Sequence, residues 1–143
     1  MRVFLDANIL FSAARAGSAV ERALHELADA GVMLVTGQHA VEEARRNLSA
    51  KRAGDLPGLE RWLPRLEITA VMAAVSHLNL VAKDQPVFGG ALAAGCTHFV
   101  TGDLRHFGDW MGQTIEGVKV VTLARLLAEW DANRVPKDRL LPE

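Results

Sequence analysis

The stretch RVFLDAN, residues 2–8, decides the class of fold. Its first four residues predict a short buried strand, and Asp6-Ala7-Asn8 predict the exit from that strand. The run FVTGD, residues 99–103, repeats the pattern and places Asp103 just after another strand. The carboxyl ends of parallel strands share one edge of a sheet, and ligands bind in the crevice there. We therefore expect Asp6 and Asp103 at a binding edge.

Short apolar runs alternate with helix-like segments along the rest of the chain. Strands are predicted at 32–35, 66–68, 98–100 and 118–121, and helices at 18–31, 39–51, 69–77, 84–94 and 122–130. This alternation predicts an α/β fold, a three-layer α/β/α sandwich with a central, mostly parallel sheet of about five strands. Without an internal linker, residues 1–143 are expected to form a single domain, with a surface tail over residues 131–143.

Composition narrows the class of protein. Half of the 143 residues are apolar, 23% are charged and the formal net charge is −1, which favours a globular protein without a strongly basic nucleic-acid coat. Cys96 is the single cysteine, so an internal disulfide and a thiolate-rich zinc site are excluded. Met1 and Arg2 lead straight into the first strand, and no stretch suits a bilayer. We expect a cytoplasmic protein that does not enter a membrane.

Four acidic residues are the candidate site. Asp6 and Asp103 follow strands, whereas Glu43 and Asp84 lie near the starts of predicted helices. Carboxylates gathered at one edge repel one another unless some are protonated or a cation lies between them. Oxygen-only ligands suit Mg²⁺ or Mn²⁺, so we predict one or two such ions. The pattern leaves Glu42 open as an alternative to Glu43, because neither lies on the apolar stripe of the helix.

Each acid also has a purely structural explanation. Asp6 could accept backbone N–H groups in a turn, and Asp103 could be a turn residue. Asp84, two residues before Pro86, could simply cap a helix. Glu43 could be a solvated residue on a helix surface. The joint arrangement of the four acids favours the functional interpretation.

That joint arrangement resembles the PIN-domain family, the metal-dependent ribonucleases that include VapC-type toxins. The resemblance covers nearly the whole chain and rests on four motifs in order: residues 3–8 with Asp6, 36–48 with Glu43, 84–92 with Asp84, and 99–107 with Asp103. It implies Asp6, Glu43, Asp84 and Asp103 as metal ligands and catalytic residues, with Asn8, Thr101, Arg105 and His106 supporting them or touching substrate. Ala7 replaces the family's frequent Thr, and His106 stands where many members have a further acid, with Asp109 the nearest carboxylate.

The resemblance also implies endonucleolytic hydrolysis of RNA, a possible antitoxin partner and a homodimer. Candidate interface residues are apolar side chains in weakly patterned regions: Phe11, Leu59, Trp62 and Met72. A stand-alone RNA-processing nuclease and a non-catalytic PIN-like binding module stay open as alternatives. Haloacid-dehalogenase-like phosphatases and dinucleotide-binding domains are disfavoured, because the residues after the first strand lack their motifs. A receiver domain is disfavoured because Thr36 and Gly37, and not a phosphorylatable Asp, follow the strand that ends at Val35.

Overall fold

A computed structural model describes residues 1–134 and contains one six-stranded sheet with the strand order β3-β2-β1-β4-β6-β5. The strands are β1 (Arg2–Leu5), β2 (Met33–Gly37), β3 (Glu67–Thr69), β4 (His98–Val100), β5 (Thr114–Ile115) and β6 (Val118–Val121). The neighbours β3-β2-β1-β4-β6 pair in parallel, and only β5 pairs antiparallel, with β6. The predicted, mostly parallel sheet is confirmed, with the two-residue β5 added at its edge.

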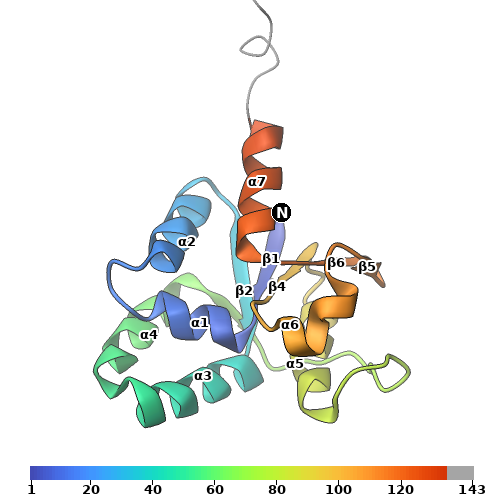
Figure 1. Ribbon diagram of the computed structural model, residues 1–143, viewed down its shortest axis with the longest axis horizontal. Coiled ribbons are helices and arrows are strands. Elements are labelled where there is room, and N and C mark those ends of the chain that lie inside the picture. Colours follow the sequence, from blue (N-terminus) through green and yellow to red (C-terminus); the bar gives the residue numbers. More distant parts are fainter. Residues whose placement is uncertain (135–143) are drawn as a thin grey trace, which may run out of the picture.

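Seven α-helices accompany the sheet in the described part of the chain. They are α1 (Ala7–Ala13), α2 (Ala19–Asp29), α3 (Gln38–Lys51), α4 (Leu56–Trp62), α5 (Gln85–Ala93), α6 (Leu104–Phe107) and α7 (Leu123–Arg134). Figure 1 shows α1 to α4 on one side of the central strands and α5 and α6 on the other. This arrangement confirms the predicted α/β/α sandwich. No helix within residues 1–134 combines the length and the apolar character that crossing a membrane requires.

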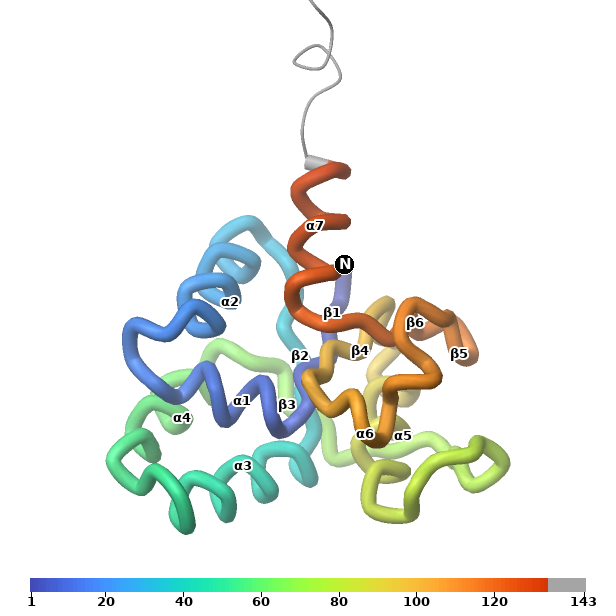
Figure 2. The backbone as a smooth tube through the Cα atoms, in the orientation of Figure 1, coloured from blue at the N-terminus to red at the C-terminus, as the bar shows by residue number. Residues whose placement is uncertain are grey.

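The strand order reverses beside β1. The chain goes from β1 outward to β2 and β3, then returns to β4 on the other side of β1 and continues to β6. The return is visible in the backbone trace, where the segment between β3 and β4 passes beneath the sheet (Figure 2). Such a reversal leaves a crevice beyond the carboxyl ends of the two strands, because their connections depart to opposite faces. Asp6 and Thr101 are the first residues beyond β1 and β4.

Aromatic rings fill the core beneath this crevice. Phe4 of β1 stacks on Phe99 of β4 with ring centroids 5.6 Å apart. Phe88 of α5 and Phe107 of α6 pack on Phe99 at 5.3 Å and 5.0 Å. All four rings are buried. Close packing of this kind fixes the strand ends that carry the candidate site. Cys96 is buried as well, as expected for a packing residue.

One predicted helix, over residues 69–77, is wrong. Thr69 ends β3, and residues 70–81 contain no helix or strand. The segment binds directly to α5: the backbone N–H of Ala73 donates to the carbonyl of Gly89 at 2.9 Å. A Cβ on Gly89 would lie 2.6 Å from the Ala73 oxygen, so the close approach depends on this glycine. A tertiary contact between two backbones overrides the local helix propensity of the sequence.

The predicted end of the last helix and the predicted interface also need correction. Helix α7 continues through Arg134, beyond the predicted end at residue 130. The remainder of the predicted tail, 135–143, lies outside the described residues. Leu59 and Trp62 are core residues with 0% and 3% exposure, and the Trp62 indole donates to the Ala13 carbonyl at 3.1 Å. They cannot form a surface interface. Met72 is 48% exposed, and Phe11 is only partly buried.

Candidate functional site

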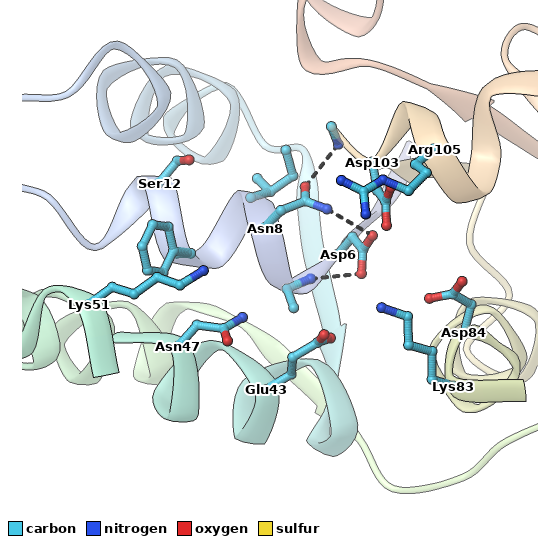
Figure 3. Close-up of a pocket in the computed structure, with 14 residues that line it drawn as sticks. Asp6, Asn8, Ser12, Glu43, Asn47, Lys51, Lys83, Asp84, Asp103 and Arg105 are labelled. Carbon is cyan, nitrogen blue, oxygen red and sulfur yellow. Dashed lines mark hydrogen bonds between the residues drawn. The ribbon is translucent and has the colours of Figure 1, made fainter. Parts of the chain in front are cut away.

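A pocket of about 600 Å³ lies at the carboxyl edge of the sheet. The four predicted acids, Asp6, Glu43, Asp84 and Asp103, all line it, although they come from four separate segments of the chain. Figure 3 shows Asp6 at the centre, with Glu43 below it on α3 and Asp84 facing it from the start of α5. The structure therefore brings together the side chains that the sequence spread over nearly a hundred residues.

Asp6 is held by a set of donors. Its side chain, only 6% exposed, caps α1 by accepting the N–H of Ala7 at 2.8 Å. The other carboxylate oxygen accepts the Thr101 hydroxyl at 2.7 Å and the Asn8 amide at 3.2 Å. Burial, together with the charges of Glu43 and Asp84, nevertheless raises the pKa of Asp6 to about 6, although the hydrogen bonds from Thr101 and Ala7 lower it. Asp6 is therefore both the N-cap of α1 and a residue of the candidate site.

Asn8 and Thr101 join the exits of β1 and β4. The Asn8 amide group donates to the Thr101 hydroxyl at 3.2 Å, and the Asn8 oxygen accepts the N–H of Gly102 at 2.8 Å. The Thr101 hydroxyl also accepts the N–H of Asp103 at 3.0 Å. Thr101 is fully buried. These bonds fix the position of Asp6 relative to the segment that carries Asp103, which gives both residues a positioning role.

Glu43 and Glu42 point to different places. Glu43 is half-buried and lines the pocket with Asp6. Glu42 is exposed and borders two smaller cavities on another side of α3, next to Gln38. The two residues are about 100° apart around the helix axis, which places adjacent side chains on different faces. Glu43 is therefore the one that can act with the other acids.

Asp84 does not cap its helix. It stands directly before α5, but its side chain makes no capping hydrogen bond and lines the pocket instead. Asp103 does act as a cap, because its Oδ1 atom accepts the N–H of His106 at 3.2 Å. Burial raises the pKa of Asp84, whereas the charges of His106 and Lys83 lower it. The helix-cap explanation of Asp84 therefore fails for its side chain.

His106 sits between two of the acids. Its Nδ1 atom lies 3.0 Å from Oδ2 of Asp84 and 2.9 Å from Oδ2 of Asp103. These contacts lack hydrogen-bond geometry, so the buried Nδ1 of His106 and Oδ2 of Asp84 have no hydrogen-bond partner. Ligand atoms of all three residues lie within 4.8 Å of one another. Asp109, the nearest further carboxylate in sequence, is exposed and does not line the pocket.

This geometry suits a divalent cation. Buried polar atoms without partners are rare and costly, and a bound ion would satisfy both of them. Asp84, Asp103 and His106 could hold one ion, with Asp6 and Glu43 on the facing side of the pocket. Three carboxylates or more with one imidazole form a hard, mostly oxygen set of the kind that Mg²⁺ and Mn²⁺ accept.

Cationic and neutral polar side chains complete the lining. Arg105 and Lys83 flank the acids, and Lys83 lies between Glu43 and Asp84 in the close-up (Figure 3). Ser12, Asn47 and Lys51 line the part of the pocket between α1 and α3. The sequence analysis predicted a supporting role for Arg105 but missed Ser12 and Asn47. The available signal for Asn47 was its spacing, since it follows Glu43 by four residues on a predicted helix.

Comparison with known proteins bears on the fold. No protein-family model and no curated protein matches the sequence. A chain of VapBC2 from Rickettsia felis, solved bound to a DNA fragment from its promoter, matches with a TM-score of 0.61 and 18% identity over 85% of this chain and 98% of that one. VapC20 from Mycobacterium tuberculosis, a toxin that cleaves the sarcin-ricin loop, matches with a TM-score of 0.50 and 14% identity over 72% and 92%. The resemblance in fold is confirmed: this chain has the PIN-domain fold of VapC-type toxins.

Proposed function

We propose that this chain is a metal-dependent ribonuclease of the VapC type that hydrolyses phosphodiester bonds within RNA. The observation that carries the proposal is the pocket itself, in which Asp6, Glu43, Asp84 and Asp103 meet at the switch point of the sheet. The likeness in fold to VapC20, a sarcin-ricin loop cleaving toxin, supports RNA as the substrate that we propose. Within residues 1–134 the hydroxyl of Ser12, which lines the pocket, has no hydrogen bond to a base that could activate it, so hydrolysis by water is the fitting reaction.

The metal requirement follows from the donor set. Asp84, Asp103 and His106 would hold one Mg²⁺ or Mn²⁺ ion, and Asp6 and Glu43 would complete its site or hold a second. When bound, such ions lower the pKa of a water and neutralise charge on the phosphate. The proposed reaction is in-line: a water oxygen bonds to phosphorus and loses a proton to solvent, the bond from phosphorus to one sugar oxygen breaks, and that oxygen takes up a proton from solvent.

The remaining side chains orient the ligands and receive the substrate. Asn8 and Thr101 hold Asp6 in one orientation through their hydrogen bonds. Lys83 and Arg105 place positive charge beside the carboxylates, where they would bind phosphate oxygens. Positive charge there offsets the repulsion between an anionic RNA strand and the carboxylates.

The proposal includes two kinds of protein partner. We propose an antitoxin as one partner, as the likeness in fold to a chain of VapBC2 suggests, and we propose that it binds over this pocket. We also propose a homodimer, as the resemblance implies. Co-expression with the product of a neighbouring small open reading frame tests the first partner. Light scattering at tens of micromolar tests the second, and a mass near the 15.5 kDa of one chain would contradict a stable dimer.

The decisive experiment compares the parent with Asp6→Asn. The parent should cleave single-stranded RNA with Mg²⁺ or Mn²⁺ and stop when a chelator is added, and Asp6→Asn should lose cleavage roughly 10³-fold. Glu42→Gln, which removes a nearby charge outside the pocket, is the matched control and should keep full activity. Circular dichroism verifies that both variants fold. A parent that binds Mn²⁺ and RNA without any cleavage would instead indicate a non-catalytic binding module.

A further inference from the structure

The pocket extends away from the carboxylates into a second region between α1 and α3. Helix α3 contributes three side chains at intervals of four residues: Glu43, Asn47 and Lys51. Four residues advance a helix by about 6 Å, so these side chains form a row on one face that changes from acid to amide to ammonium. Figure 3 shows the row leading from Glu43 through Asn47 to Lys51, away from Asp84.

An aromatic ring borders the same region. Phe11 of α1 lines the pocket and is only partly buried. The Arg52 guanidinium lies 4.0 Å from the centre of this ring and also donates to the Phe11 carbonyl at 3.1 Å. Arg52 is itself fixed, with Nε 3.6 Å from a carboxylate oxygen of Asp55. The ring is therefore held in place from the side of Arg52 while its remaining surface borders the pocket.

Lys51 and Arg52 are neighbours in sequence but differ in exposure and in their ion pairs. Arg52 is largely buried and is committed to Asp55 and Phe11. Lys51 is exposed, lines the pocket and takes part in none of the ion pairs found among residues 1–134. An ammonium group without an internal partner can bind a phosphate without first giving up a carboxylate.

We propose that Phe11, Asn47 and Lys51 form a nucleotide subsite that binds one unpaired nucleotide of RNA next to the bond that is cleaved. Phe11 stacks on the base, Asn47 hydrogen-bonds to it, and Lys51 binds the following phosphate. An aromatic ring accepts only a base that has left its own stack, so the subsite selects single-stranded or looped RNA over a regular duplex. The inference rests on the proposed ribonuclease function, because only in that function does the reacting phosphate lie at the carboxylates next to this subsite.

The test measures binding separately from cleavage. The full chain is titrated with a short unstructured oligoribonucleotide that carries 2-aminopurine, a base whose fluorescence falls when it stacks. Ca²⁺ replaces Mg²⁺ during binding, and the same samples are checked for cleavage. Lys51→Gln should lower the slope of log affinity against log salt by about 0.7, the value for one phosphate contact to a single strand. Arg46→Gln, an exposed cation of α3 outside the pocket, is the matched control and should leave the slope unchanged.

Phe11 is tested by its stacking. Phe11→Leu should weaken binding about tenfold and remove the loss of fluorescence, whereas Phe11→Tyr should retain both. Equal salt slopes for Lys51→Gln and Arg46→Gln, or parent-like quenching with Phe11→Leu, would overturn the subsite. Lys51 is exposed, so its result stands even where Phe11→Leu disturbs the fold. A parent that binds as described but never cleaves with Mn²⁺ contradicts the ribonuclease function and leaves the subsite supported as a binding site.

Discussion

Asp6 and Asp84 face each other across one pocket but are built in opposite ways. Asp6 accepts three hydrogen bonds, from Ala7, Asn8 and Thr101, at the end of a central strand. Asp84 follows the irregular segment between β3 and α5, and its buried Oδ2 atom has no hydrogen-bond donor. Burial raises the pKa of both carboxyl groups. The first is fixed by hydrogen bonds, whereas the buried Oδ2 atom of the second has only the charges of His106 and Lys83 to stabilise its ionised form.

The difference indicates that Asp6 and Asp84 have different roles in the site. A carboxylate fixed by hydrogen bonds keeps its geometry whether or not an ion is present. A carboxylate without donors gains most from the ion, because the ion supplies the missing partner. We therefore expect Asp6 to define the position of the site and Asp84, with His106 beside it, to define its affinity for metal.

The largest expected effect concerns Glu43, which lines the pocket with Asp6 and Asp84 and whose charge raises the pKa of both. Glu43→Gln should reduce RNA cleavage roughly 10³-fold, equivalent to about 4 kcal/mol in the barrier. Glu42→Gln removes the same charge one residue earlier but outside the pocket, and should leave the rate unchanged. Initial rates with Mn²⁺ measure both. Equal losses in the two variants would contradict the assignment of Glu43.

The second prediction uses pH to test the burial of Asp6. Its pKa rises from 3.8 in the unfolded chain to about 6 in the folded protein, so the folded state binds the proton more tightly. Stability from this group is fully present below pH 3.8 and is lost as the pH rises through 6. The loss is about 3 kcal/mol without metal, as an upper figure for one group.

Urea unfolding with a chelator present, at several pH values from 4 to 7, measures this loss. Asp6→Asn carries no titrating proton and should flatten the decline over that range. Added Mg²⁺ should restore stability near pH 7, because it binds the folded state. A parent protein that becomes more stable from pH 4 to 6 by the same amount as Asp6→Asn would show that Asp6 ionises normally.

A smaller effect is expected from the hydrogen bonds that fix Asp6. Thr101→Val removes the hydroxyl that donates to Asp6 at 2.7 Å and should lower metal affinity or activity about 10- to 100-fold. Thr36→Val is the matched control, since Thr36 is equally buried but donates to the Leu5 carbonyl at 2.9 Å, outside the site. Calorimetric titration with Mn²⁺ compares the two. If both valine variants lose affinity equally, the hydroxyl of Thr101 acts only through packing.

The same contrast explains what could be predicted from the sequence. The ends of β1 and β4 could be predicted from the local sequence. A short apolar run followed by Asp6, or by residues 101–103, predicts a strand and the point where it ends. The parallel topology then places those exits together, so the neighbourhood of Asp6 follows from pattern alone. Asp84 lies after residues 70–81, whose path is set by contact with α5, and the sequence predicted a helix there.

The direction of side chains was the second feature that the sequence could not predict. The sequence offered both Glu42 and Glu43, and only the packing of α3 against α1 decides which one faces the pocket. The sequence also predicted only a supporting or substrate-contacting role for His106, because only the fold brings its Nδ1 atom on α6 to within 3.0 Å of Asp84 at the start of α5. Periodicity locates a residue on an element, but the rotation of that element comes from its tertiary neighbours.

The smallest predicted effect tests whether His106 is a ligand. An imidazole nitrogen favours Mn²⁺ over Mg²⁺ more than an oxygen does, because Mg²⁺ accepts nitrogen poorly. His106→Asn replaces that nitrogen with a neutral oxygen donor of shorter reach. It should lower the ratio of Mn²⁺ to Mg²⁺ affinity by up to about tenfold, equivalent to about 1.4 kcal/mol. Titration of both ions into parent and variant gives the ratio.

His77→Asn is the control, because His77 is exposed and pairs with Glu116 away from the pocket. An unchanged ratio would assign His106 to the ion pairs with Asp84 and Asp103 alone and leave the metal to the carboxylates.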